Sequence, residues 1–256
     1  NQDISGWDVS SVISLSSTFE GATSFNQDIS GWDVSSVTSF MQTFVDATSF
    51  NQPLNDWNTS SVVSMQTTFG GATAFNQPIG NWDVSSVVTM AYMFSGATNF
   101  NQDISGWDIN KVTTLKQTFR NASSFNQDIS DWNISSVTTM HETFYGATAF
   151  NQPIWKWDVS KVIGMGGMFR GTSNFNADLS GWDVSSVADM SAMFYGTEAF
   201  NQNISDWNTS SVTSMWLMFK VAAAFDQDVS GWDLSSIDGN GVGGMFDGAS
   251  SLSNLN

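Results

Sequence analysis

The stretch that decides the fold is NQDISGWDVSSV, which occupies residues 1–12 and returns unchanged at residues 26–37. Near-copies follow every 25 residues, and the tenth begins at Asp226. A fixed period of this length is typical of repeat proteins, in which each unit stacks on its neighbours. We therefore expect a single solenoid domain over residues 1–256, cut from a longer chain. Its ten predicted repeats are 1–25, 26–50, 51–75, 76–100, 101–125, 126–150, 151–175, 176–200, 201–225 and 226–256.

Certain residue types recur at fixed positions when each repeat is numbered from 1 to 25. Position 7 is Trp in all ten copies, and position 25 is Phe in nine. One unit alone cannot enclose so many apolar side chains, whereas stacked units share a continuous interior. Position 1 is Asn in nine copies. We expect these Asn side chains to satisfy backbone amides of successive coils, because each carries both an acceptor and donors.

The second half of each repeat has the spacing of a helix. Positions 15, 18, 19 and 22 are apolar in many copies, as in Met90, Met93, Phe94 and Ala97. This i, i+3, i+4, i+7 pattern predicts a short amphipathic helix that ends at position 21, which is often Gly. The first half lacks that period and suits short strands. The sequence thus predicts an α/β repeat solenoid that is leucine-rich-repeat-like, with short parallel strand(s) and a short helix in each of ten coils.

Charge and composition exclude several partners. The formal net charge is −17, and residues 1–100 contain eight acids and no Lys or Arg. A chain this acidic repels nucleic acid and anionic lipid surfaces. No apolar run is long enough to span a membrane, so we expect no direct membrane insertion. The chain contains no Cys, which excludes disulfides and thiolate chemistry.

The unit FNQDISGWDVSSVTxMxxMFxGATxF, with its W-D-V-S-S-V and M-F-x-G-A motifs, resembles the repeats of bacterial surface proteins of Listeria and of mycoplasma lipoproteins. Those repeats are similar to the BspA-like branch of leucine-rich repeats. The resemblance covers all ten repeats. It implies a secreted or cell-surface scaffold for adhesion or ligand binding. The implied partner is a surface protein or glycan of a host or neighbouring cell. It implies no catalytic residue.

The residues themselves point to no enzyme, metal site or cofactor. His141 is the only histidine. No Ser or carboxylate pairs with it in a fixed register, so we favour a solvated surface side chain over a catalytic one. Asp recurs at position 8, as in Asp33 and Asp83, and becomes Asn at Asn58. Because Asp and Asn both cap turns, capping is favoured over a ladder of carboxylates bridged by calcium.

The strongest candidate for a binding surface is position 20. There the residue alternates between basic and aromatic types over five coils, on what we expect to be an exposed helix flank. Exposed aromatic residues beside Arg are typical of recognition surfaces. Neutral variation on a solvated face explains the pattern equally well. The candidate binding residues are Arg120, Tyr145, Arg170, Tyr195 and Lys220, together with Trp155, Lys156 and Trp216, which also break the repeat pattern.

We therefore predict a non-enzymatic binding scaffold. The alternative is a structural protein that assembles through the open ends of its solenoid into a filament or surface layer. Ice binding through positions 13 and 14 ranks lower, because the threonine array there is interrupted, and calcium binding ranks equally low.

Overall fold

The computed structural model describes residues 1–253, and over that range it contains no helix. Its β-type pairing consists of isolated single-residue bridges, which join position 14 of successive coils in parallel. Examples are Ser14 with Ser39 and Thr139 with Gly164. The rest of the described backbone is turns and short links. The predicted α/β leucine-rich-repeat-like solenoid, with a helix and strands in each coil, is therefore wrong.

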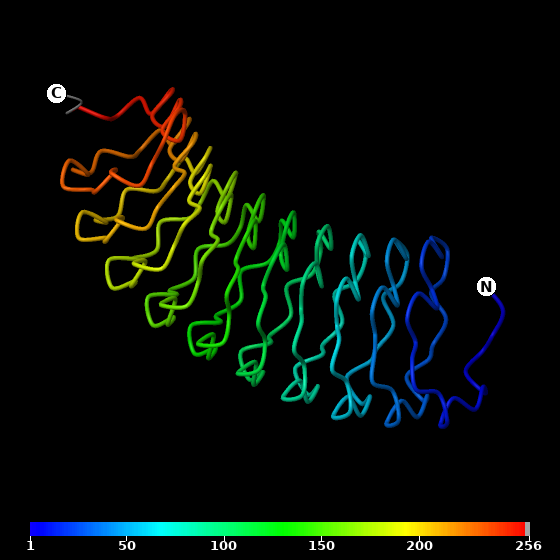
Figure 1. Cartoon of the computed structure of the whole chain (residues 1–256). Coiled ribbons are helices and arrows are strands. Elements are labelled where there is room, and N and C mark those ends of the chain that lie inside the picture. Colours follow the sequence, from blue (N-terminus) through cyan, green and yellow to red (C-terminus); the bar gives the residue numbers. More distant parts are fainter. Residues whose placement is uncertain (254–256) are drawn as a thin grey trace.

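The 25-residue units form coils that lie one on another, and the two termini lie at opposite ends of a curved stack (Figure 1). Backbone hydrogen bonds run along this stack. Met140, Glu142 and Phe144 donate their N–H groups to the carbonyl oxygens of the residues 24 positions later, at 2.9 Å each. Because every coil offers the same donors and acceptors to the next, the repeat stays in register.

The segment predicted as a helix is instead a pair of β-turns. In coil 6, residues 126–150, Thr143 donates its N–H to the Met140 carbonyl and Ala147 donates its N–H to the Phe144 carbonyl. The third residue of each turn is left-handed, with φ of 52° at Glu142 and 66° at Gly146. A positive φ at the third residue only is the geometry of a type II turn, and it cannot occur inside a right-handed helix.

The turns give the same inward pattern that a helix would give. A β-turn brings its first and fourth residues together, so positions 15 and 18 face the interior, as do positions 19 and 22. The turns also point alternate N–H groups along the stack, where the next coil accepts them. Buried backbone groups need such partners, and here the partner lies in another coil rather than four residues away.

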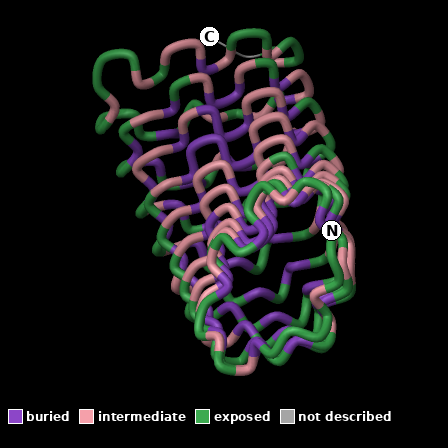
Figure 2. The backbone as a smooth tube through the Cα atoms, turned by 90° about the vertical axis from the view of Figure 1, so that its right-hand side faces the viewer, coloured by how far each residue is buried: buried purple, intermediate pink, exposed green. Residues whose placement is uncertain are grey.

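The interior consists of columns of like side chains. Figure 2 shows the buried residues, in purple, recurring at corresponding places in successive coils. The ring of Phe144 is stacked between those of Phe119 and Phe169, with centroid distances of 5.6 and 5.8 Å. From the second coil on, the Trp of position 7 also has a polar partner. Trp132, for example, donates its indole N–H to the carbonyl of Ile104 in the coil before, at 3.1 Å. Trp7 is the exception to the predicted burial, because the first coil has no such neighbour and leaves Trp7 61% exposed.

Position 9 also belongs to the core, although the sequence analysis did not assign it. Val84, Ile109 and Ile134 are each only 1% exposed. In coils where this residue is Thr, the hydroxyl has a partner, as Thr59 donates to the carbonyl of Asp83 at 2.9 Å. Burying a hydroxyl without such a bond would be costly, so the exchange of Val for Thr depends on the neighbouring coil.

The predicted role of the Asn column is confirmed. The side-chain oxygen of Asn101 accepts the backbone N–H of Asn126, and that of Asn126 accepts the N–H of Asn151, both at 2.9 Å. In the last coil Asp226 takes the same place and accepts the N–H of Ser253 at 2.8 Å. Each side chain therefore satisfies the amide one coil further on.

Candidate functional site

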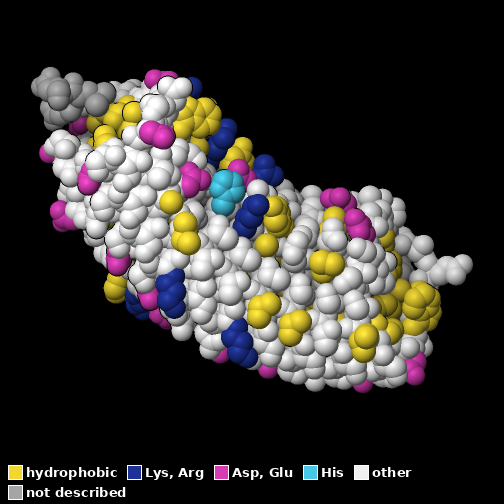
Figure 3. Space-filling view, in the orientation of Figure 1, with side chains coloured by type: hydrophobic (Ala, Val, Ile, Leu, Met, Phe, Trp, Pro, Cys, Tyr) yellow, Lys and Arg dark blue, Asp and Glu magenta, His cyan; other side chains and the backbone are white. Residues whose placement is uncertain are grey.

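The outward side chains of the turn segment form columns along the stack, and position 20 is one of them. The inward positions of the turns fill the core, so positions 16, 17 and 20 are left to face outward. Figure 3 shows His141, in cyan, among Lys, Arg and hydrophobic side chains along the edge where the outline of the molecule is hollowed. The repeat thus brings residues from successive coils onto one face.

The alternating residues of position 20 contact one another and form what we call the cation–π ladder, Arg120–Tyr145–Arg170–Tyr195. The guanidinium carbon of Arg120 lies 4.8 Å from the centroid of the Tyr145 ring. Arg170 lies 5.4 Å from the same ring and 4.5 Å from that of Tyr195. Both faces of Tyr145 are therefore next to a cation, an arrangement that the negative face of an aromatic ring favours.

The ladder differs from the prediction in two ways. Its side chains are half-buried against each other rather than fully exposed on a helix flank. Lys220 belongs to the same column, but its ammonium nitrogen lies 3.9 Å from the Asp247 carboxylate in the last coil. The structure therefore brings together four of the five predicted position-20 residues in direct contact, and Lys220 continues the column as part of an ion pair.

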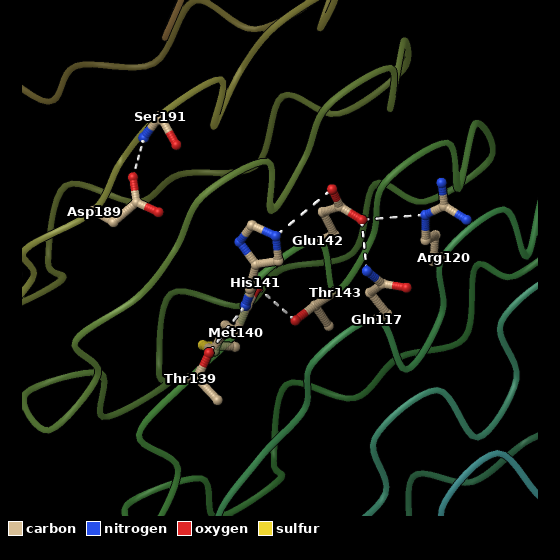
Figure 4. A network of polar contacts seen from close by, with 9 residues as sticks. All are labelled: Gln117, Arg120, Thr139, Met140, His141, Glu142, Thr143, Asp189 and Ser191. Atoms are coloured by element: carbon tan, nitrogen blue, oxygen red, sulfur yellow. Dashed lines mark hydrogen bonds and ion pairs between the residues drawn. The ribbon is translucent and has the colours of Figure 1, made fainter. Parts of the chain in front are cut away.

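A polar network lies beside the ladder (Figure 4). Glu142 is at its centre, with Oε2 3.2 Å from Arg120 Nε and accepting a 2.8 Å hydrogen bond from Gln117 Nε2. Its Oε1 lies 3.6 Å from His141 Nε2. The Arg120 contact is an ion pair without hydrogen-bond geometry, although Arg120 Nε is buried. Glu142 thereby compensates the positive charge at one end of the ladder.

The His141 side chain lies at the surface, as predicted, with 38% of it exposed and the rest covered by neighbours. Its neighbours come from other coils as well as from its own, since Asp189 and Ser191 lie nearby from coil 8 (Figure 4). These residues do not form a hydrogen-bonded catalytic relay. Asp189 accepts the backbone N–H of Ser191 at 2.9 Å, and no hydrogen bond between described residues joins the Ser191 hydroxyl to His141.

Sequence reasoning missed the residues that surround the ladder. The Lys116 ammonium lies 5.7 Å from the Tyr92 ring in the coil before, and Glu142 joins three residues of coils 5 and 6. The available signal was the column itself. Positions 16 and 17 of coils 5 and 6 hold Lys116, His141 and Glu142, which the 25-residue period places next to one another.

The other predicted binding residues divide into two places. Trp216 lies in column 16, on the same face as the ladder, and is 50% exposed. Trp155 and Lys156 lie in a different turn, at positions 5 and 6, where Lys156 donates a 2.7 Å hydrogen bond to Asp131. That bond and the charge of Asp131 raise the pKa of Lys156. Among residues 1–253, no hydrogen bond, ion pair or cation–π contact connects this pair to the ladder.

The Asp residues of position 8 cap turns. Asp83 accepts hydrogen bonds from the Ser85 backbone at 3.0 Å and the Ser85 hydroxyl at 2.7 Å. Asn58 caps Ser60 in the same way, with distances of 3.2 and 2.7 Å. In the described part of the chain, no group of three or more His, Cys, Asp or Glu side chains is arranged to hold a metal ion.

A pH-dependent effect should follow from this capping. The hydroxyl of Ser85 and then its N–H hold the pKa of Asp83 below its ordinary value. A lowered folded-state pKa contributes stability above the unfolded pKa, near pH 4, and this contribution is lost as the pH falls through the folded pKa. We expect Asp83→Asn to keep most of the parent's stability at pH 7, because Asn58 makes the same capping hydrogen bonds. Its small deficit should vanish as the pH falls through the folded pKa of Asp83.

Asp83→Ala is the matched variant that removes the cap. It should lower the free energy of unfolding at pH 7 by about 1 kcal/mol or less, as expected for exposed hydrogen bonds. Urea unfolding followed by tryptophan fluorescence between pH 7 and 3 measures both variants. A loss in Asp83→Asn as large as that in Asp83→Ala would show that the carboxylate charge, rather than the cap, stabilises the turn.

No helix in the described residues has the length and apolar character that crossing a membrane requires. Fold and site together define a repeat protein of stacked 25-residue coils, with a basic and aromatic face on coils 5 to 8. Its sequence matches the family model described as "Mycoplasma protein of unknown function, DUF285" over residues 1–78, 52–156 and 148–255. The chain therefore belongs to this family. The predicted similarity to mycoplasma repeats is confirmed as membership of this repeat family.

Comparison with curated proteins gave no match. Among solved structures, the chain is similar to one in the "Crystal structure of TLR13-ssRNA13 complex", with 11% sequence identity and a TM-score of 0.28. The matched region covers 79% of this chain and 35% of that chain, so it spans about a third of the other protein's length.

Proposed function

We propose that this protein is a non-enzymatic scaffold that binds a protein or glycan through the face that carries the cation–π ladder. The observation that carries the proposal is the ladder itself, which extends over four successive coils in a chain of formal charge −17. Arg, Tyr and Trp are the residue types that most often dominate binding energy at interfaces.

The mutual contacts of the ladder favour binding because they limit side-chain motion. A free Arg or Tyr loses rotamer freedom when a partner immobilises it, and this opposes association. In the ladder, Tyr145 already lies between Arg120 and Arg170, and Glu142 holds Arg120 from the side. The backbone beneath is held by hydrogen bonds between coils. A partner would therefore meet a surface whose shape is largely set in advance.

The cellular setting is part of the same proposal. The family match names only mycoplasma proteins of unknown function. Display at the cell surface or outside the cell, where an adhesive scaffold would meet its partner, therefore rests on the resemblance of the repeat motifs to those of bacterial surface proteins. The overall negative charge disfavours nucleic acid and anionic membranes as partners. A positively charged strip within an acidic protein would instead select where and in which orientation a partner docks.

The test is a triple variant of the ladder, Tyr145→Ala with Arg170→Ala and Tyr195→Ala. Ligands are first identified by screening the parent protein on arrays of glycans and cell-surface proteins. The variant should bind the resulting ligand about 30-fold more weakly or worse, as expected when interface hot spots are removed. The measurement is titration calorimetry, with thermal unfolding to show that the coils remain folded.

The control is Lys111→Ala with Lys161→Ala, which removes two exposed positive charges from position 11 of coils 5 and 7, the coils that also carry Arg120 and Arg170. This double variant should keep the parent affinity. An unchanged affinity in the triple variant would contradict the proposal, and so would a ligand held entirely by residues 1–100.

A further inference from the structure

Arg170 differs from the other two cations of the position-20 column, because no carboxylate compensates its charge. Arg120 Nε lies 3.2 Å from Glu142, and the Lys220 ammonium lies 3.9 Å from Asp247. Among residues 1–253, no ion pair or side-chain hydrogen bond involves the Arg170 guanidinium, whose close contacts are the two tyrosine rings of the ladder. A half-buried positive charge is therefore left without an opposite charge in the middle of the ladder.

The repeat explains why Arg170 lacks such a partner. Glu142 reaches Arg120 from position 17 of the following coil, and the residue at position 17 of the coil that follows Arg170 is Ala192. Glu142 and Ala192 have the same left-handed backbone, with φ of 52° and 51°. The two arginines thus occupy equivalent places in the stack, and only Arg120 receives a carboxylate from the chain itself.

The Arg170 guanidinium is held in place while its donors stay open. The rings of Tyr145 and Tyr195, in the coils on either side, lie 5.4 and 4.5 Å from its central carbon. The N–H groups of a guanidinium lie in one plane and form a fork that matches the two oxygens of a carboxylate. Unlike Arg120 Nε, no Arg170 nitrogen is buried without a partner, so solvent and a ligand can reach these donors.

We infer that Arg170 binds one carboxylate side chain, an Asp or a Glu, of a partner polypeptide through two parallel N–H···O hydrogen bonds. This inference rests on the proposed binding function and names the chemistry of the partner. The partner's carboxylate compensates Arg170 as Glu142 compensates Arg120. Because the two tyrosine rings already limit the motion of the Arg170 side chain, binding costs little rotamer entropy.

The charges around Arg170 favour a single carboxylate over a polyanion. Glu142 and Asp189 lie near His141 on the same face, from the coils before and after that of Arg170. A uronate polysaccharide, heparin or a nucleic acid carries a charge on nearly every unit and would bring further anions against these carboxylates. A polypeptide can present one acid among neutral residues, and its backbone carbonyls can accept hydrogen bonds from the tyrosine hydroxyls of the ladder.

The inference is tested with octapeptides that carry one central Glu among Gly, Ser, Ala, Tyr and Leu, each with a copy in which Gln replaces the Glu. The parent protein should bind the best Glu peptide at least about tenfold more tightly than its Gln copy, as measured by titration calorimetry. Arg170→Gln should abolish this preference. Arg170→Lys should lose most of it, because Lys keeps the charge but lacks the fork.

Lys161→Gln is the matched control, because it removes an exposed positive charge from position 11 of the same coil as Arg170. This variant should keep the parent's preference for Glu over Gln. Thermal unfolding of every variant shows that the coils remain folded.

A second pair of variants supplies the carboxylate from within the chain. Ala192→Glu should pair with Arg170 as Glu142 pairs with Arg120, and should therefore abolish the preference for the Glu peptide. Ala192→Gln, which is neutral and of nearly the same size, should keep the preference. Gln117 shows that the fold accepts Gln at position 17 with the same backbone, at φ 54°.

A spectroscopic readout identifies the arginine that meets the peptide. Arg120 and Arg170 are the only arginines, so a ¹H–¹⁵N spectrum of the parent contains two arginine Nε–H resonances. The Glu peptide should shift the resonance that is missing from the spectrum of Arg170→Gln. A shift confined to the Arg120 resonance would contradict the inference.

The inference would be overturned by a preference for Glu that survives Arg170→Gln or Ala192→Glu, or by equal binding of the Glu and Gln peptides to the parent. Tighter binding of polygalacturonate or heparin than of every Glu peptide would overturn it as well. A ligand from the array screen that is lost in the triple ladder variant but kept in Arg170→Gln would refute this inference and leave the proposed function standing. A ligand kept in both variants would contradict both.

Discussion

Phe144→Ala is expected to lower the free energy of unfolding by about 3–5 kcal/mol, the usual range for removing a buried aromatic side chain. Phe144 is fully buried, and its ring centroid lies 3.9 Å from that of Phe150 in the same coil. It is also stacked on Phe119 and Phe169 in the coils on either side. The alanine variant would leave a cavity between three coils, which neighbours fixed by backbone bonds cannot close.

The comparison is Phe246→Ala, the same substitution in the last coil. Phe246 is only partly buried and stacks on Phe219 from one side, at 5.6 Å. Its loss should cost clearly less, because repeat proteins gain stability from contacts between nearest neighbours and the last coil has one neighbour fewer. Urea unfolding monitored by tryptophan fluorescence measures both. Equal losses at Phe144 and Phe246 would contradict the nearest-neighbour description.

Ala192→Pro should destabilise the protein by at least about 3 kcal/mol. Ala192 is the left-handed residue of its turn, with φ 51°, whereas proline requires a φ near −65°. The substitution also removes the N–H that Ala192 donates to the carbonyl of Trp216 at 2.7 Å. Ala192 has no functional side chain, so the effect reports on the backbone alone.

Two further variants make this result specific to the turn. Ala192→Gly should raise the free energy of unfolding by about 1 kcal/mol, because a left-handed conformation is costly for any residue with a Cβ. In a helix, the same change would lower it by a similar amount. Asp178→Pro in the same coil should be mild, since Pro153 occupies that position one coil earlier. A loss on Ala192→Gly would argue for the helix that the sequence pattern predicts.

Repetition alone defined the columns of the core. The same residue returns every 25 positions. This period was enough to place Trp132 and Phe144 in the interior, and Asn126 in the column of Asn side chains that bond backbone amides. Each coil must present the same surface to its neighbour, so the residues that form this surface recur in the sequence. The basic and aromatic alternation of position 20 was visible for the same reason.

The backbone conformation could not be obtained in this way. Apolar residues at positions 15, 18, 19 and 22 fit a helix and a pair of turns equally well, since both bring residues three apart to one side. The decisive residues at position 17 include Thr67, Tyr92 and Gln117, which carry no signal for the left-handed conformation they adopt. What favours that conformation is the carbonyl group of the next coil, 24 residues away.

For the candidate site too, the sequence determined some features and the tertiary structure determined others. The residues of the ladder were identified from the sequence, but their half-burial, the central place of Glu142 and the convergence of three polar side chains on Gly166 were not. His141, Asp189 and Ser191 lie far apart in the chain and have no common motif. Only the stacking of coils 6, 7 and 8 directs their polar atoms to one point, because side chains of adjacent coils lean into the space that a glycine leaves open.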